Sequence, residues 1–217
     1  MIKFQVVDDN SSDENLKKLK DLIKTHGIDC EIINHNKSEH KEKIAAENNQ
    51  ETWGNLSSLL KCFEIAKKDQ SDLIYFVEDD YLHYEHSLVD MLNTYERVSS
   101  QHKDEIIVCP SDYPFNYMNN EKTNILIGSQ QHWRTITKML CTFMISKKMF
   151  QKHINNFEKT CEKRHDPFEK YINEILLNEI GISPINTLSV HLTNVKSSYG
   201  LSPFVYIKKL WDENNTS

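Results

Sequence analysis

Short apolar runs alternate with amphipathic stretches along the first half of the chain. A β-prone run at 2–7 precedes a helical pattern at 14–25, and a second β-prone run follows at 30–33. A further amphipathic helix is predicted at 55–67, before an apolar strand at 73–77. Because strands that alternate with helices pair in parallel through crossovers, this order predicts an α/β fold.

The polar segment at 34–52 has no clear period, and we interpret it as a surface excursion that is long enough to carry function. The second half of the chain is less regular. The remaining predicted elements are a helix around residues 88–95, strands at 106–109, 125–127 and 142–145, a polar loop at 111–124, helices at 147–157 and 167–179, and a frayed tail from residue 212.

Length and composition predict one folded domain over residues 1–217. Hydrophobic residues make up only 38% of the chain, but three tryptophans, nine tyrosines and nine phenylalanines are bulky enough to build a core. The net charge of -6 excludes a generally basic surface, so we expect no nucleic-acid partner. The composition does not indicate an oligomeric state.

The five cysteines lie at least 20 residues apart and form no C-x-x-C pair, which predicts free thiols in a reducing compartment. No apolar stretch is long enough to span a membrane, and the beginning of the chain lacks the order of a signal peptide. We therefore expect a cytoplasmic protein without a transmembrane segment, while peripheral membrane contact stays open.

Two predicted strands end in acidic clusters. Asp8 and Asp9 follow the first strand, and Glu78, Asp79 and Asp80 follow the strand at 73–77. Like charges about 4 Å apart repel by roughly 4 kcal/mol at an effective dielectric near 20, so the second cluster needs a cation. Carboxylates on a partly open site suit Mn²⁺ or Mg²⁺ together with substrate phosphates. The alternative is that these acids are simply solvated in a loop.

The opening Val6-Val7-Asp8-Asp9-Asn10, followed by an amphipathic helix, resembles a response-regulator receiver domain, in which paired acids bind Mg²⁺. Such domains also carry a later Lys-Pro pair. This sequence contains no Lys-Pro pair. The receiver resemblance is therefore local.

A second resemblance covers about residues 2 to 195. Val6-Val7-Asp8-Asp9-Asn10-Ser11-Ser12-Asp13, the helix from near Asn55, and Ile74-Tyr75-Phe76-Val77-Glu78-Asp79-Asp80 resemble the family 2 glycosyltransferases with the GT-A fold. The resemblance implies a Rossmann-type mixed, mostly parallel sheet flanked by helices. It also implies a nucleotide-binding part at about 1–110 and an acceptor-side part at about 111–205. Family members usually begin with one more strand, so we expect a truncated start or a differently built sheet edge.

The resemblance implies roles for the acids at the two strand ends. Asp9, with Asp8 beside it, would accept the N3–H of a uracil-like base, and helix capping is the alternative for such aspartates. Glu78, Asp79 and Asp80 would stand for the D-x-D motif, with Asp80 the direct metal ligand and Asp79 near the ribose or diphosphate. Glu78 departs from the motif.

Residues of the second half complete the predicted site. The resemblance implies that Asp166 is the general base and that His191 supplies an imidazole to the metal or diphosphate. Asp166-Pro167-Phe168-Glu169 is also a typical helix start, and both roles can hold together. Trp133 offers a platform for a sugar ring and Arg134 a guanidinium for phosphate. The alternative is core packing for Trp133, and packing or a surface position for His191.

These observations favour an inverting, metal-dependent glycosyltransferase that moves a single sugar from a UDP-linked or other nucleotide-diphosphate sugar to a glycan or other hydroxyl acceptor. The Trp-Arg order differs from the Q-x-x-R-W motif of processive synthases, which favours transfer of one residue. The alternative is a receiver-like or degenerate, non-catalytic nucleotide-sugar-binding module.

Overall fold

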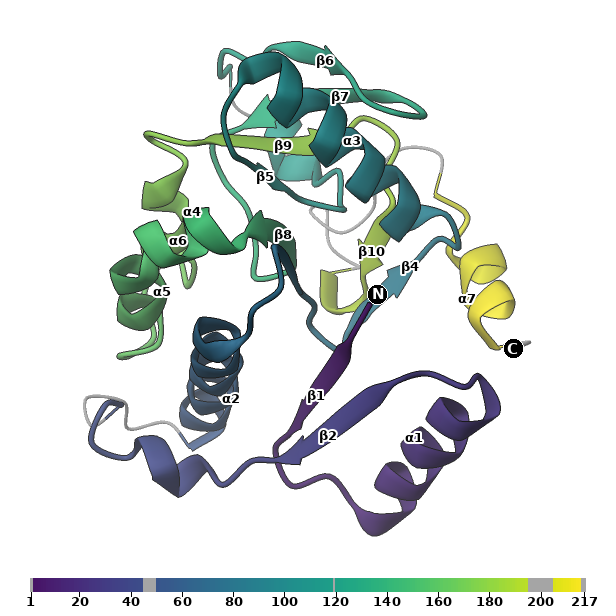
Figure 1. Cartoon of the computed structure of the whole chain (residues 1–217), viewed down its shortest axis with the longest axis vertical. Coiled ribbons are helices and arrows are strands. Elements are labelled where there is room, and N and C mark those ends of the chain that lie inside the picture. Colours follow the sequence, from purple (N-terminus) through teal and green to yellow (C-terminus); the bar gives the residue numbers. More distant parts are fainter. Residues whose placement is uncertain (1, 45–49, 119, 195–204, 216–217) are drawn as a thin grey trace. The chain divides into compact units, whose positions relative to one another are not determined.

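The computed structural model describes residues 2–44, 50–118, 120–194 and 205–215, and it divides into two compact units. Unit 1 comprises Met1–Asp69 and Asn155–Phe168, and unit 2 comprises Gln70–Ile154 and Glu169–Ser217. Figure 1 labels the helices and strands of both. The break after Asp69 lies well before residue 110, where the resemblance implied a division. The single-domain assignment stays a prediction.

Unit 1 is built on two parallel strands, β1 (Phe4–Asp8) and β2 (Cys30–Asn34), which helix α1 (Asp13–Thr25) connects. Parallel strands need a connection of this length. Ser12 caps α1 by accepting a hydrogen bond from the Asn15 backbone N–H at 3.3 Å. Gly27, with φ of 60°, supplies the left-handed residue beyond the helix end. This predicted strand–helix–strand order is confirmed.

The segment after β2 is less exposed than its polar composition predicted. The side chains of His35, His40 and Ile44 have exposed fractions of 3%, 2% and 0%. Both imidazoles hydrogen-bond the buried hydroxyl of Ser57, which a hydropathy pattern cannot reveal. The interpretation of 34–52 as a surface excursion is therefore wrong at His35, His40 and Ile44, whereas most of their described neighbours up to residue 43 are exposed. Residues 45–49 lie outside the described residues. The other helices of unit 1 are η1 (Lys37–His40), α2 (Gln50–Lys68) and α5 (Ile154–Thr160), whose first residue belongs to unit 2.

The described residues of unit 2 form a mixed six-stranded sheet with the order β3-β8-β5-β9-β7-β6. Only β5 and β9 are parallel neighbours, and all other adjacent pairs are antiparallel. The expected mostly parallel sheet is therefore wrong. The reason is that β6, β7 and β8 follow one another without a crossover helix, and β8 inserts between β3 and β5. The strands are β3 (Leu73–Phe76), β5 (Ile106–Val108), β6 (Ile125–Ile127), β7 (His132–Ile136), β8 (Phe143–Ser146) and β9 (Ile180–Pro184).

Helices flank this sheet, and α3 (Ser87–His102) covers one of its faces and contacts β5 (Figure 1). Their shared core contains Met91, Val98, Ile106, Val108, Trp133, Met144, Ile182 and Leu188. The helix predicted at 147–157 is interrupted at His153, whose Nε2 lies 2.7 Å from the Glu179 carboxylate, and is divided into α4 (Lys147–Lys152) and α5. The helix predicted at 167–179 shortens to α6 (Lys170–Ile175).

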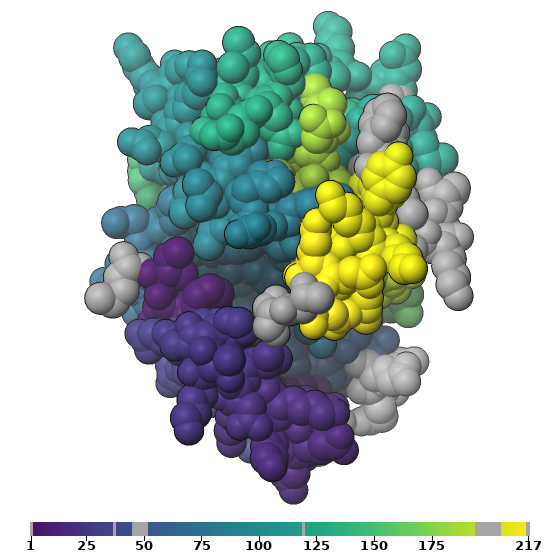
Figure 2. Space-filling view, turned by 90° about the vertical axis from the view of Figure 1, so that its right-hand side faces the viewer, coloured from purple at the N-terminus to yellow at the C-terminus, as the bar shows by residue number. Residues whose placement is uncertain are grey.

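The last described helix is α7 (Ile207–Asn215), which Figure 2 shows in yellow on the molecular surface. Leu210 is buried, and the Asn214 side-chain amide donates a hydrogen bond to the His83 carbonyl at 3.3 Å. The frayed tail predicted from residue 212 is therefore helical through Asn215, because these contacts hold it, and 216–217 lie outside the described residues. No described helix has the length and hydropathy of a membrane span.

Candidate functional site

The acidic segment Glu78, Asp79 and Asp80 lies at one edge of the unit 2 sheet. It follows β3, whose direction matches that of β5 and β9, so the carboxyl ends of these three strands meet at this edge. Thr142, directly before the antiparallel β8, lies at the same edge. Its hydroxyl accepts from the Glu78 backbone N–H at 3.1 Å and donates to the Glu78 carboxylate at 3.3 Å. Open parallel α/β sheets bind ligands at such an edge, and β3, β5 and β9 run in the same direction here although most neighbouring strands are antiparallel.

The charges at this edge repel one another. Burial raises the pKa of the Glu78 carboxyl to about 7, and the charges of Asp80, Glu169 and Asp79 act in the same direction. Burial also raises the pKa of Glu169. Within the described residues, no lysine or arginine forms an ion pair with these four carboxylates. Among the described residues, His191 is thus the one basic side chain in ion-pair contact with this acid cluster.

A separate pair of strands brings Asp80 and His191 together. Strands β4 (Tyr81–His83) and β10 (Ser189–His191) are antiparallel, and His191 lies opposite Tyr81 in their register. His191 Nε2 is 2.8 Å from Asp80 Oδ2, and the Thr193 hydroxyl donates to the same oxygen. The two residues that the sequence assigned to a metal are thus in direct contact, although 111 positions separate them.

Because an ionised carboxylate only accepts hydrogen bonds, His191 Nε2 carries a proton and donates it to Asp80 in this contact. If a Mn²⁺ or Mg²⁺ ion displaced that proton, the two side chains would fit neighbouring positions around it. Adjacent ligands of an octahedral ion with bonds of about 2.1 Å lie roughly 3 Å apart, close to the observed separation. An imidazole is softer than the oxygen ligands that Mg²⁺ prefers, so this pair favours Mn²⁺. Among the described residues, no three His, Cys, Asp or Glu side chains form a complete metal site. Water and substrate phosphate would have to supply the other ligands.

Asp8 and Asp9 differ in their surroundings within unit 1. Asp8 is buried, and both of its carboxylate oxygens accept from the Ser11 backbone N–H at 3.3 Å, which gives it a local structural role. Asp9 is exposed, and its carboxylate lies against Gly54 of α2, where an added Cβ would be 3.0 Å from Oδ2. Its charge also acts on His35, at the end of β2. Asp9 is therefore the member of the pair that is open to a ligand.

Asp166 is exposed and belongs to unit 1, whereas Glu169 belongs to unit 2. Helix α6 begins at Lys170, with Glu169 rather than Asp166 at the capping position. The capping interpretation of Asp166 is therefore wrong, and its role as general base stays a prediction. Glu169 is half-buried, and its charge acts on Glu78. We identified it only from the structure, because the sequence pattern indicated a third residue of a helix.

Trp133 and Arg134 lie in β7 and are both buried. Trp133 has no exposed surface and packs in the core cluster, so its indole has no open face for a sugar ring. The Arg134 guanidinium lies 3.3 Å from the buried Asp112 carboxylate and 3.9 Å from the centre of the Tyr117 ring. The burial of Trp133 corresponds to the packing alternative, and the contacts of Arg134 occupy the guanidinium that was expected to bind phosphate.

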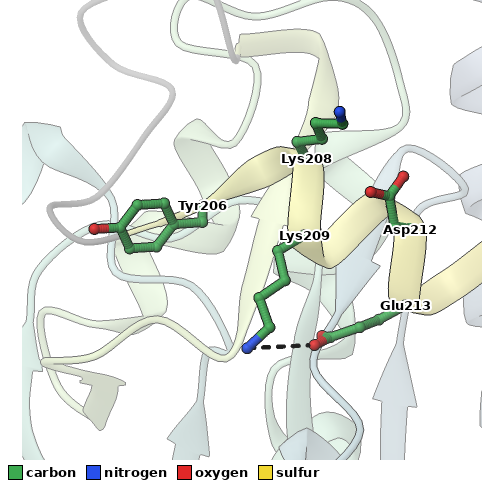
Figure 3. Close-up of a pocket in the computed structure, with 5 residues that line it drawn as sticks. All are labelled: Tyr206, Lys208, Lys209, Asp212 and Glu213. Carbon is green, nitrogen blue, oxygen red and sulfur yellow. Dashed lines mark ion pairs between the residues drawn. The ribbon is translucent and has the colours of Figure 1, made fainter.

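A surface hollow of about 500 Å³ lies on α7 (Figure 3). Its lining residues are Tyr206, Lys208, Lys209, Asp212 and Glu213. Lys209 and Glu213 form an exposed ion pair at 3.6 Å, one helical turn apart. None of the acid-cluster residues lines this hollow.

Comparison with known proteins does not identify a family for this chain. No model of a protein family matches the chain, and a search of curated proteins finds no match. The features that bear on function are therefore the acid cluster and the β4–β10 pair, which brings Asp80 and His191 into contact.

Proposed function

We propose that the protein is an inverting glycosyltransferase of GT-A type, which moves one sugar from a UDP-linked donor to a hydroxyl acceptor with a divalent metal ion. The contact between Asp80 and His191 carries this proposal. It lies inside an acid cluster that no described lysine or arginine pairs with. A metal ion bound there would neutralise the charge that develops on the leaving diphosphate.

The chain's own residues divide the remaining work. Asp80 and His191 would hold the metal ion, and Asp79, the residue before Asp80, would contact the ribose or diphosphate. A carboxylate takes the proton of the acceptor hydroxyl while the acceptor oxygen bonds to the anomeric carbon and the bond from that carbon to the diphosphate breaks. Two carboxylates compete for this role, Asp166 from the sequence and Glu169 from the structure. Burial raises the pKa of Glu169, which strengthens its ionised carboxylate as a base.

The metal assignment is tested by thermal unfolding with UDP and Mn²⁺. A ligand at 100 times its Kd stabilises the folded state by about 2.7 kcal/mol. We expect Asp80→Ala to remove the Mn²⁺-dependent part of this stabilisation, and Asp72→Ala, at an exposed aspartate of the same unit, to keep it. Undiminished Mn²⁺-dependent binding by Asp80→Ala would contradict the proposal. Stabilisation by acetyl phosphate and Mg²⁺ instead would favour a receiver-like protein.

The base is tested by the hydrolysis of UDP-sugars, in which water replaces the acceptor. Glu169→Gln should lower the rate by roughly 10²–10⁴-fold while donor binding persists, since the carboxylate acts on the proton and not on the donor. Asp166→Asn is the matched variant, and a greater loss there would return the role to Asp166. Donor binding without any turnover by the wild-type protein would favour a non-catalytic nucleotide-sugar-binding module.

A further inference from the structure

Tyr81 lies directly beside the imidazole of His191. The two residues are opposite one another in the antiparallel β4–β10 pair, where facing side chains approach most closely. Their rings are stacked, with centroids 4.7 Å apart and planes only 9° from parallel. The edge of the imidazole that carries Nε2 is at the same time directed at Asp80. Stacking on Tyr81 therefore sets the plane of the His191 imidazole, and the contact with Asp80 sets the direction of Nε2 within that plane.

The Tyr81 ring is itself held in place. Its side chain is 7% exposed, and its hydroxyl lies 2.5 Å from the hydroxyl of Tyr113, which is 5% exposed. Tyr113 follows β5 and stacks on Phe115, with ring centroids 5.0 Å apart. The surface against which His191 packs is thus tied to the buried segment that follows β5. Burial and the hydroxyl contact restrict the movement of the Tyr81 ring.

We infer that Tyr81 is a positioning residue for His191, which keeps the imidazole beside Asp80 in the orientation that a metal ion requires. This inference rests on the proposed function. An imidazole rotates about χ2 unless neighbours restrict it, and Nε2 leaves the metal position when it does. Outer partners of metal-ligating histidines typically contribute 10-fold to 100-fold in metal affinity. Tyr81 acts here through ring contact rather than through a hydrogen bond to the imidazole.

Three variants of the full chain separate this role from a general effect on folding. Tyr81→Leu removes the stacked ring, and we expect it to weaken Mn²⁺ binding by about 10-fold to 100-fold in calorimetric titration. Tyr81→Phe keeps the ring and should restore the affinity to within about 3-fold of the wild type. In a His191→Ala background, Tyr81→Leu should cause no further loss. A full additional loss in that background, or wild-type affinity of Tyr81→Leu alone, would overturn the inference.

A metal-free measurement tests the contact itself and does not depend on Mn²⁺ binding or on the folding of any variant. In wild-type protein, NMR should show cross-relaxation between the Tyr81 and His191 rings and an upfield ring-current shift of the imidazole protons. Absence of both signals overturns the inference. If the signals are present but the wild type binds no Mn²⁺, the proposed function has failed while the ring contact stands.

Discussion

At the scale of single residues, the acidic side chains at the ends of β1 and β3 have different environments, although all of them are carboxylates. Asp8 is buried and satisfied by a backbone N–H, whereas its neighbour Asp9 is exposed. Glu78 is half-buried among other acids, with its pKa raised to about 7. The local sequence is similarly acidic in each case, so the environment and not the residue type separates structural acids from candidate functional ones.

The contact between Asp9 and Gly54 gives a prediction at this scale. Alanine in a helix interior is normally more stable than glycine by about 0.8–1.0 kcal/mol, but an added Cβ at position 54 would meet Asp9 Oδ2 at 3.0 Å. Because Asp9 is exposed and can move aside, we expect Gly54→Ala to preserve or raise the free energy of unfolding and to weaken UDP binding.

Urea unfolding and UDP titration measure the two effects of Gly54→Ala separately. Asp9→Ala provides the reference for complete loss of the carboxylate. UDP affinity unchanged in Gly54→Ala but reduced in Asp9→Ala would show that Asp9 does not need its present position. Unchanged affinity in both would remove Asp9 from the nucleotide site.

At the scale of elements, a buried polar chain connects the segment after β2 to α2. His40 Nε2 lies 3.1 Å from the Glu64 carboxylate, so this nitrogen carries the proton, and His40 Nδ1 accepts from the Ser57 hydroxyl at 2.9 Å. His35 Nε2, 2.8 Å from the same hydroxyl, then donates to it. His35 Nδ1 is left as a buried nitrogen without a partner among the described residues. Protonation there would place an unsatisfied N–H next to His40.

From this buried hydrogen-bond network we expect unit 1 to become less stable at acid pH. Burial is the main cause that lowers the pKa of His35, and the neighbouring His40 acts in the same direction. The unfolded state takes up a proton near pH 6.5, before folded His35 does, so the free energy of unfolding falls as the pH drops below about 6.5. The loss continues down to the lower pKa of the folded state.

Urea unfolding at pH 7.5, 6.5 and 5.5 measures this dependence. His35→Gln keeps a donor at the Nε2 position without a titrating group, and we expect it to be less sensitive to acid than the wild type. His26→Gln, at an exposed histidine of the same unit, should retain the wild-type pH dependence. Equal pH slopes for His35→Gln and the wild type would contradict the role of the buried chain.

At the scale of the whole molecule, the core of unit 2 decides which aromatic residues are available to ligands. Trp133 has no exposed surface, whereas 49% of Trp211 on α7 is exposed. Trp133→Ala should therefore lower the free energy of unfolding by about 3–5 kcal/mol, through lost burial and the cavity left behind. Trp211→Ala should cost less than about 1 kcal/mol.

Chemical denaturation of both variants, followed by circular dichroism, measures this difference. Donor binding at a temperature where Trp133→Ala stays folded should match that of the wild type, because its indole does not reach the surface. A selective loss of UDP-sugar affinity with nearly unchanged stability would instead restore Trp133 to a sugar-binding role.

The sequence alone determined the strand–helix–strand start of the chain and the presence of acids at two strand ends. β1, α1 and β2 were predictable because hydrophobic period, the Ser12 cap and Gly27 act over a few residues. Asp80 and His191 could be named as candidates, but nothing local places them in contact. Only the β4–β10 pairing does so, and likewise only tertiary structure inserts β8 between β3 and β5 and brings Glu169 to Glu78. The physical reason is that strand partners are selected by hydrogen bonds and burial between distant segments, which leave no periodic trace in either segment by itself.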